Sequence, residues 1–444
     1  MSEYVVLLSV PGLRDQDLAH MPLLSKLVDG GDRATLAASL PAVTCPVQAN
    51  MTTGTPPSEH GVVANGFYWR ESDSPKRGTV EMWTAANDCI ERPQLWDVLH
   101  EQDSQLTSAV WFPLHSKQCG ADYVCTPAPI HNPDGSESLW CYTKPEALYG
   151  ELRDEFGHFP LHHFWGPTAG IASTAWIVSS AIHAAKQYKP NLFYVYVPHL
   201  DYAAQKHGPD SEQAIAALGE LDNEIGRLVE GFADAYSHEN PLWLVASEYV
   251  ITPVNNVSYP NRALREAGLL KVCDSEHGGV IDYAASDAWA LVDHQFSHVF
   301  LSESADQDHI AELLRSLSGV ADVFAPAERA EYDLNHQRSG DLVVVSHPDS
   351  WQAYYWWDDD EKAPTFARTV DIHRKPGYDP VELFFDAEKK CIPLDATLVK
   401  GSHGAPAMED AQRGVLLCSQ KGVFVERPLA DIDVADIVLR QFGI

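Results

Sequence analysis

The chain has 444 residues, and its 31 basic and 63 acidic side chains give it a formal net charge of −32 at pH 7. Hydrophobic residues make up 45% of the sequence and charged residues 21%, a globular composition that excludes wholesale disorder. A surface this acidic repels phosphate backbones and anionic lipids, so neither a nucleic-acid polymer nor a membrane is expected as a partner. A small anionic substrate is still compatible, because a metal ion or a helix N-terminus reverses the field locally.

The N-terminal residues, MSEYVVLLSV, lack the basic start and the small-residue cleavage site of a signal peptide, so none is expected. No segment approaches the roughly 20 uninterrupted apolar residues that span a bilayer. Residues 170–185 come nearest, but serine, threonine and histidine interrupt them and predict a buried helix. The eight cysteines include no CxxC pair and predict reduced thiols. These features together favour a cytoplasmic protein.

Four short, continuously apolar runs predict strands that are buried on both faces, as in a parallel sheet. In chain order they are residues 4–10, 192–197, 242–246 and 342–345. The clearest helix is predicted over residues 211–236, where apolar residues recur at helical spacing and Asp210 or Ser211 supplies the N-cap. Strands that alternate with helices indicate a doubly wound α/β fold.

Two regions fit this alternation badly, and we interpret both as insertions: residues 120–167 and residues 255–340. The predicted organisation is a core over 1–254 with an irregular insertion near 120–167, an inserted cap subdomain over 255–340, and a return to the core over 341–444 that carries His403. Ligands in such folds bind beyond the carboxyl ends of the strands. The residues that follow the first three runs are therefore candidates, although ordinary turns are polar too: Pro11 and Gly12, then His199 and Asp201, then Ser247 to Tyr249.

The most specific pattern lies between Leu40 and Tyr68. It reads LPAVTCPVQAN, then Thr53-Gly54, then PSEHGVVANGFY, and further blocks follow at residues 201–209, 247–249 and 401–404. In this order, over nearly the whole chain, the blocks resemble the type I phosphodiesterase/nucleotide pyrophosphatase branch of the alkaline phosphatase superfamily. The resemblance implies an alkaline phosphatase-like fold, with a mostly parallel central sheet, helices on both faces and an inserted cap.

By family position, the resemblance implies that Thr44 is the nucleophile and forms a phospho-threonine intermediate, while Asn65 holds a phosphoryl oxygen. Elementary electrostatics agrees, because a hydroxyl at a helix N-terminus lies where free N–H groups and the helix dipole stabilise negative charge. The alternative is purely structural, with Thr44 capping a helix and Asn65 closing a turn. We interpret Cys45, beside Thr44, as a core residue.

Members of this family bind two zinc ions through six side chains, and the resemblance carries over only Asp201 and His403 unchanged. The other four positions hold Pro11, Gln205, Glu248 and Tyr249. Glu248 keeps a carboxylate, whereas Gln205 offers only a neutral amide oxygen. A full two-zinc site is therefore not expected. The predicted cofactor is one divalent ion, zinc, manganese or magnesium, held by Asp201, His403 and either Gln205 or Glu248.

Two later segments leave alternatives open. Residues 351–361 read WQAYYWWDDDE and either line a substrate pocket or, more commonly for such a run, form a sheet edge followed by a solvated acidic turn. Residues 368–378 read RTVDIHRKPGY, in which Arg374 and Lys375 either bind a phosphate or carboxylate or offset the acidic residues 358–360.

The predicted function is a phosphoric-ester hydrolase that attacks a phosphodiester or pyrophosphate through Thr44, with a reduced metal site. The alternative is a catalytically inactive or repurposed phosphate-pocket binding protein on the same fold. A sulfatase or phosphonate hydrolase is a third candidate, but sulfatases use a modified cysteine or serine where this chain has Thr44. A small phosphate-containing substrate is the expected partner. The sequence indicates neither its identity, nor the residues that bind it, nor the oligomeric state.

Overall fold

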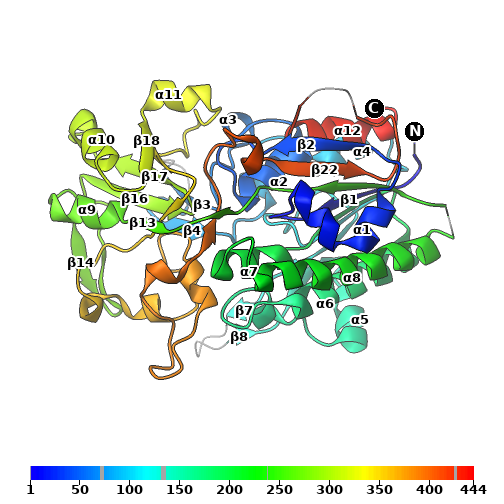
Figure 1. The fold of residues 1–444 in the computed structure, drawn as a ribbon, viewed down its shortest axis with the longest axis horizontal. Helices are drawn as coiled ribbons and strands as arrows, with labels where there is room; N and C mark the ends of the chain where they lie inside the picture. Colours follow the sequence, from blue (N-terminus) through cyan, green and yellow to red (C-terminus); the bar gives the residue numbers. More distant parts are fainter. Residues whose placement is uncertain (1, 71–74, 132–136, 238, 425–427) are drawn as a thin grey trace.

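The computed structural model of the chain describes residues 2–70, 75–131, 137–237, 239–424 and 428–444. Its largest feature is a nine-stranded sheet in the order β23-β2-β22-β11-β1-β10-β5-β6-β9 (Figure 1). In chain order these strands are β1 (Val5–Ser9), β2 (Arg33–Ala37), β5 (Ser108–Trp111), β6 (Tyr123–Pro127), β9 (Cys141–Lys144), β10 (Leu192–Tyr196), β11 (Leu242–Ala246), β22 (Gly414–Cys418) and β23 (Leu429–Ala430). Only β22 and β9 run antiparallel to their neighbours, so the predicted mostly parallel α/β sheet is confirmed.

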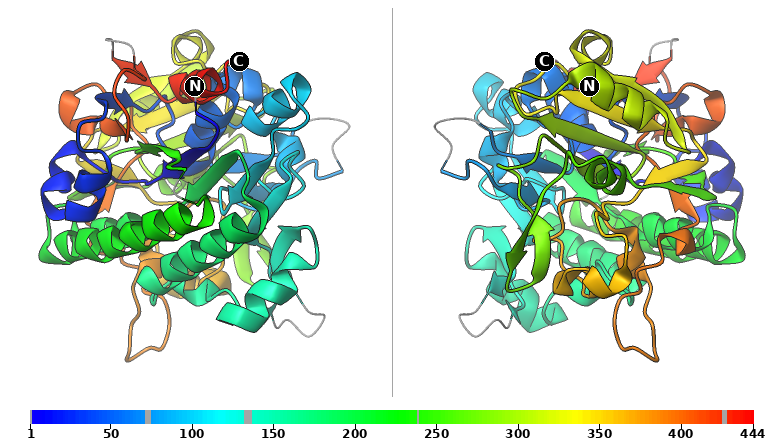
Figure 2. Two further views of the ribbon diagram at one scale, coloured as in Figure 1. Left: turned by 90° about the vertical axis from the view of Figure 1, so that its right-hand side faces the viewer. Right: turned by 90° about the vertical axis from the view of Figure 1, so that its left-hand side faces the viewer.

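Helices cover both faces of this sheet (Figure 1 and Figure 2). One face carries α1 (Pro22–Leu27), α5 (Leu148–Phe156), α6 (Ile171–Tyr188) and α8 (Glu212–Ala235), and the other carries α2 (Thr44–Thr53), α4 (Leu95–Gln102) and α12 (Asp433–Gln441). Successive residues of β1 face opposite layers: Val6 and Leu8 join the first helices, and Val5 and Leu7 join the second. Burial on both faces explains why the run is continuously apolar.

Two helices predicted from the sequence are confirmed. The first helical turn of α8 is capped by Ser211, whose hydroxyl accepts a hydrogen bond from the N–H of Ala214 at 3.1 Å. The buried helix predicted near residues 170–185 is α6. Within the described ranges, no helix has both the length and the apolar character needed to cross a membrane.

A second, antiparallel sheet of four strands forms a lobe on the left of Figure 1. Its order is β16-β17-β19-β18, from β16 (Ala288–Asp293), β17 (Phe296–Leu301), β18 (Val320–Phe324) and β19 (Leu342–Ser346), and it packs with α9 (Pro260–Glu266), α10 (Gln307–Arg315) and α11 (Pro326–Glu331). We expected the run at 342–345 in the parallel core sheet, but as β19 it pairs antiparallel with β17 and β18. A continuously apolar run indicates burial on both faces, which a central strand of either sheet provides.

The chain returns from this lobe to the main sheet through short elements. β20 (Ser350–Gln352) pairs with β13 (Asn256–Ser258), and β21 (Gly401–Ser402) pairs with β12 (Thr252–Pro253). The aromatic residues 351–357 are buried in the core of the lobe, and the acidic residues 358–360 that follow are exposed. Further short elements are α3 (Pro57–His60), β3 (Gly66–Tyr68), β4 (Val80–Met82), β7 (Ile130–His131), β8 (Glu137–Ser138), α7 (His199–His207), β14 (Val272–Ser275) and β15 (Gly278–Ile281).

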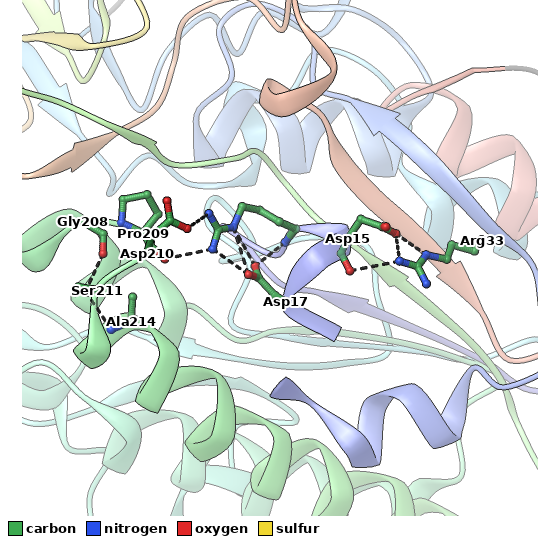
Figure 3. A network of polar contacts seen from close by, with 9 residues as sticks. Asp15, Asp17, Arg33, Gly208, Pro209, Asp210, Ser211 and Ala214 are labelled. Atoms are coloured by element: carbon green, nitrogen blue, oxygen red, sulfur yellow. Dashed lines mark hydrogen bonds and ion pairs between the residues drawn. The ribbon is translucent and has the colours of Figure 1, made fainter. Parts of the chain in front are cut away.

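An ion pair and a hydrogen bond join the loop after β1 to the turn before α8 (Figure 3). Arg14 donates to Asp17 at 2.8 Å, to Asp210 at 2.7 Å and to the carbonyl of Pro209 at 3.1 Å. The side chains of Arg14 and Asp17 are only 16% and 4% exposed, whereas the neighbouring pair of Arg33 and Asp15 is 50% and 62% exposed. The shielded pair therefore fixes the segment between β1 and α1.

Arg14→Met leaves the buried carboxylate of Asp17 without its charged partner, so we expect the free energy of unfolding to fall by about 2 kcal/mol. Arg33→Met removes the arginine of the exposed pair and serves as the matched control, with an expected change within about 0.5 kcal/mol. Guanidinium unfolding monitored by tryptophan fluorescence measures both. Equal losses in the two variants would show that shielding does not set the strength of these pairs.

Candidate functional site

Thr44 opens α2, as predicted, and its side chain is buried. Val43 before it is extended, with φ −131° and ψ 161°, so the chain turns into the helix at this point. The first N–H groups of a helix have no partner within the helix, and the positive end of the helix dipole lies there. The hydroxyl of Thr44 is therefore placed where a negative charge is stabilised.

Asn65 is held at the same helix end. Its Oδ1 accepts a hydrogen bond from the N–H of Cys45 at 2.9 Å, and its Nδ2 donates to Oδ1 of Asp293 at 3.0 Å. The backbone N–H of Asn65 donates to the other oxygen of Asp293 at 2.8 Å. The structure thus brings Thr44 and Asn65 together at the start of α2, and Cys45 is buried in the core. Asn65 keeps a second amide hydrogen with which it can bind a ligand.

Tyr249, three residues beyond β11, links Thr44 to Asp201. Its hydroxyl donates to Oδ2 of Asp201 at 2.9 Å and lies 3.0 Å from Oγ1 of Thr44. A phenol has one hydrogen, and Tyr249 gives it to Asp201, so Thr44 is the donor in the other contact. The result is a directional hydrogen-bond chain from Thr44 through Tyr249 to Asp201. The three residues are 3%, 2% and 7% exposed, so solvent does not compete for these bonds.

Four aromatic side chains stack beside this hydrogen-bond chain, and we call Tyr249, His403, His294 and Tyr378 the ring stack. Their ring centroids are 3.6, 3.9 and 3.6 Å apart in that order, with interplanar angles of 4°, 44° and 14°. Two rings this close to His403 cannot share one of its faces, so His403 lies between Tyr249 and His294. The stack therefore joins residues of the main sheet to the second lobe.

The other two predicted metal ligands are bound to partners within the chain. Oε1 of Gln205 accepts a hydrogen bond from the hydroxyl of Tyr378 at 2.5 Å. Oε1 of Glu248 accepts from Ser9 at 2.6 Å and from Gln48 at 2.8 Å. Glu248 is therefore held between β1 and α2, whereas Gln205 is held by the ring stack.

The side chains present do not fit the predicted metal site. Across the described ranges, no three histidine, cysteine, aspartate or glutamate side chains are grouped so as to hold a metal ion. Asp201 and His403 both contact Tyr249, one through its hydroxyl and the other through its ring. Three buried atoms of the predicted ligands have no hydrogen-bond partner among the described residues: Oδ1 of Asp201, Oε2 of Glu248 and Nε2 of His403. Nδ1 of His403 lies 2.8 Å from the carbonyl of Ala42 and so carries the proton of the neutral ring.

Burial governs the protonation of this site. It raises the pKa of Asp201 to about 7, although the hydrogen bond from Tyr249 acts in the opposite direction. It raises the pKa of Glu248 to about 8 against the hydrogen bonds from Ser9 and Gln48, and the pKa of Asp293 to about 6. Burial, together with His294, holds the pKa of His403 well below its usual range. The imidazole of His403 is therefore neutral near pH 7, where the carboxyl groups titrate.

Three residues that the sequence did not indicate complete the site: Asp293, His294 and Tyr378. Asp293 ends β16, and His294 begins the two-residue turn to β17 with φ +58°, a position where glycine is typical. Nδ1 of His294 lies 2.6 Å from Oδ1 of Asp293. The sequence VDHQF between two apolar runs is compatible with a hairpin turn, but nothing in it indicates contact with a distant helix end.

Lys375 and Arg374, whose roles the sequence left open, both pair with carboxylates nearby in the chain. Lys375 is buried, and its Nζ lies 2.7 Å from Asp379 and 2.6 Å from Glu382. Arg374 is exposed and pairs with Asp371 at 2.9 Å. Lys375 therefore stabilises the segment that carries Tyr378 and does not offset the acidic residues 358–360.

We predict that Glu248→Gln stabilises the protein in alkaline, metal-free buffer. The pKa of Glu248 is about 8 in the folded chain against an ordinary 4.5, so only the folded chain keeps this proton between these values. The stability this proton contributes is present below the lower value and is lost as the pH rises through the upper one. The uncharged amide should change little near about pH 5 and raise the free energy of unfolding by on the order of 3 kcal/mol near about pH 9.

Denaturant unfolding of wild type and variant at both pH values measures this difference. Glu230→Gln, at an exposed position of α8, is the matched control and should change neither value. A stabilisation by Glu248→Gln that is the same at both pH values would mean that the carboxyl group does not titrate in this range.

The comparisons with known proteins agree with this fold. The family described as type I phosphodiesterase/nucleotide pyrophosphatase matches residues 5–379. An uncharacterised pyrophosphatase/phosphodiesterase of Schizosaccharomyces pombe is 22% identical over 269 residues, which cover 57% of this chain and 45% of that protein. The chain therefore matches less than half the length of this curated relative.

Two solved structures share the fold over nearly their whole length. Phosphonoacetate hydrolase from Sinorhizobium meliloti 1021, in complex with phosphonoformate, has a TM-score of 0.63 at 16% identity, with 98% of this chain and 95% of that chain covered. Human ectonucleotide pyrophosphatase/phosphodiesterase 5 has a TM-score of 0.62 at 14% identity, with 99% and 95% covered. At these identities the likeness concerns the fold alone. Because the family match extends over residues 5–379, the chain belongs to the type I phosphodiesterase/nucleotide pyrophosphatase family of the alkaline phosphatase superfamily.

Proposed function

We propose that this chain is a phosphoric-ester hydrolase in which Thr44 attacks phosphorus and the Tyr249–Asp201 pair takes up the proton of Thr44. The observation that carries the proposal is the hydrogen-bond chain, with 3.0 Å between the Thr44 and Tyr249 oxygens and 2.9 Å between Tyr249 and Asp201. Membership in the family supports the reaction class, and a phosphodiester or pyrophosphate is the proposed substrate.

In the first step, Oγ1 of Thr44 forms a bond to phosphorus while the bond from phosphorus to the leaving oxygen breaks. The proton of Thr44 passes to the oxygen of Tyr249 as the phenol proton passes to Asp201, so no phenolate accumulates. The N-terminus of α2 and the second amide hydrogen of Asn65 stabilise the negative charge on the phosphoryl oxygens. The leaving oxygen takes a proton from solvent.

In the second step, a water oxygen bonds to phosphorus while the bond from phosphorus to Oγ1 of Thr44 breaks. Asp201 returns its proton to the phenol of Tyr249, and the phenol returns one to Thr44. The proton of the attacking water leaves with the phosphate product or to solvent. The hydrogen-bond chain is then restored to the arrangement it had before the reaction.

A phosphate-binding protein without turnover is the second candidate, and the ring stack is the observation that favours it. Its four side chains are between 1% and 5% exposed and fill the region beside Thr44. In this alternative, Thr44 bonds to Tyr249 only because a buried hydroxyl needs a partner. The two candidates differ in whether a phospho-threonine forms.

Thr44→Ala should lower kcat/KM for bis(p-nitrophenyl) phosphate at least about a thousandfold, because the nucleophile is lost. Its melting temperature should stay close to that of wild type, since only one small polar group is removed. Thr53→Ala, at the other end of α2, is the matched control and should keep wild-type activity. Intact-mass spectrometry after an acid quench should show the phosphoryl adduct in wild type and in Thr53→Ala but not in Thr44→Ala. Hydrolysis that survives in Thr44→Ala removes the covalent role, and saturable binding without hydrolysis by wild type selects the second candidate.

Tyr249→Phe keeps the ring against His403 but deletes the hydroxyl, so kcat should fall about a hundredfold or more with little change in KM. Tyr378→Phe is the matched control, because it deletes the other phenol of the ring stack, which contacts Gln205 and not Thr44. We expect it to lower kcat only a fewfold. Steady-state kinetics with the same diester compares the two variants, and equal losses would exclude a specific proton route through Tyr249.

A further inference from the structure

We propose that the phenols of Tyr249 and Tyr378 bind the side chains that a divalent metal ion would need, and that the site is formed without such an ion. The proposal takes the place of the one-ion site expected from the sequence. It concerns the cofactor of the hydrolase proposed above and rests on that proposed function. Metal binding, however, is measured without turnover.

Tyr249 keeps Asp201 and His403 from acting together as ligands. Its hydroxyl holds Oδ2 of Asp201 at 2.9 Å, and its ring lies 3.6 Å from the ring of His403 at an angle of 4°. The remaining free oxygen of Asp201 and free nitrogen of His403 are two donors, whereas a zinc site needs about three or four protein ligands. Pro11, two residues beyond β1, adds none.

Tyr378 forms a hydrogen bond with Gln205, which is one of the two candidates for a third metal ligand. The hydroxyl of Tyr378 donates to Oε1 of Gln205 at 2.5 Å. The backbone fixes this contact, because the N–H of Tyr378 donates to the carbonyl of Val292 at 2.9 Å, and Gly377 bridges to the same residue. The buried ammonium of Lys375 holds the same segment through Asp379 and Glu382. Tyr378 is therefore fixed over the site by both its backbone and its neighbours.

The other candidate, Glu248, is held by hydrogen bonds from β1 and α2. Its Oε1 is shared by Ser9 of β1 and Gln48 of α2, at 2.6 and 2.8 Å. These bonds fix the carboxyl of Glu248 and leave only Oε2 free, and this oxygen forms no metal-binding group with the free atoms of Asp201 and His403. The predicted ligands thus have partners within the protein, and among the described residues they form no metal-binding group.

The test is a metal titration of the full-length protein after treatment with chelator and dialysis. Zinc, manganese and magnesium chlorides are added separately, unbound metal is removed by gel filtration, and plasma mass spectrometry counts the metal that remains. We expect wild type to retain well below one equivalent of each. Tyr249→His removes the phenol and places an imidazole beside Asp201 and His403, so it should retain about one equivalent of zinc.

Tyr332→His makes the same exchange in the second lobe and, as the matched control, should match wild type. One equivalent of zinc on wild type that Asp201→Ala abolishes would overturn the proposal. Zinc-free Tyr249→His protein that is folded by circular dichroism would also overturn it, because Tyr249 would then not be what excludes the ion. If Tyr249→His does not fold, the wild-type titration still decides between the two results.

This outcome is separable from that of the proposed function. Wild-type protein that binds no metal and shows no hydrolysis would remove the hydrolase and keep the metal-free site. Wild-type protein that hydrolyses the diester only with bound zinc would keep the hydrolase and remove the metal-free site.

Discussion

The hydroxyl of Tyr249 is the contact on which the rest of the site depends. It accepts from Thr44 and donates to Asp201, while its ring supports His403. Because Thr44 and Asp201 are buried, each would lose a hydrogen-bond partner that solvent does not replace if the phenol were absent. The ring stack extends this contact to His294, so the arrangement of the nucleophile depends on how the second lobe sits against the main sheet. The same contact that orients Thr44 also separates two predicted metal ligands.

Local patterns in the sequence predicted the elements of the fold better than their pairing. The strand β1 and the helices α6 and α8 could be predicted because their apolar spacing matches burial on two faces or on one. The strand β19 has the same apolar character as β1, yet it belongs to the antiparallel sheet of the second lobe. Composition indicates how deeply a strand is buried, but which sheet it joins depends on long-range pairing that leaves no local mark.

The site was predictable where a motif fixed it. Thr44 opens a helix and Asn65 lies beside it, as the motif blocks led us to expect. Asp201 and His403, which we predicted as metal ligands, both contact the side chain of Tyr249. The sequence indicated Tyr249 only as a position where a metal ligand is lost. Its two hydrogen bonds are made with Thr44 and Asp201, which lie 205 and 48 positions away along the chain, so no local pattern indicates them. His294, Asp293 and Tyr378 have no motif at all and reach the site through a hairpin turn and an irregular segment. Their roles follow from tertiary contacts alone.

The most direct measurement is a crystal structure of the wild-type protein soaked with vanadate and zinc chloride, with anomalous data collected at the zinc edge. We predict vanadate bonded to Oγ1 of Thr44, the hydroxyl of Tyr249 still in contact with Asp201, and no zinc peak between Asp201 and His403. A zinc peak within bonding distance of Asp201 and His403, with the ring of Tyr249 displaced, would contradict the proposal that the phenol of Tyr249 takes the place of a metal ion.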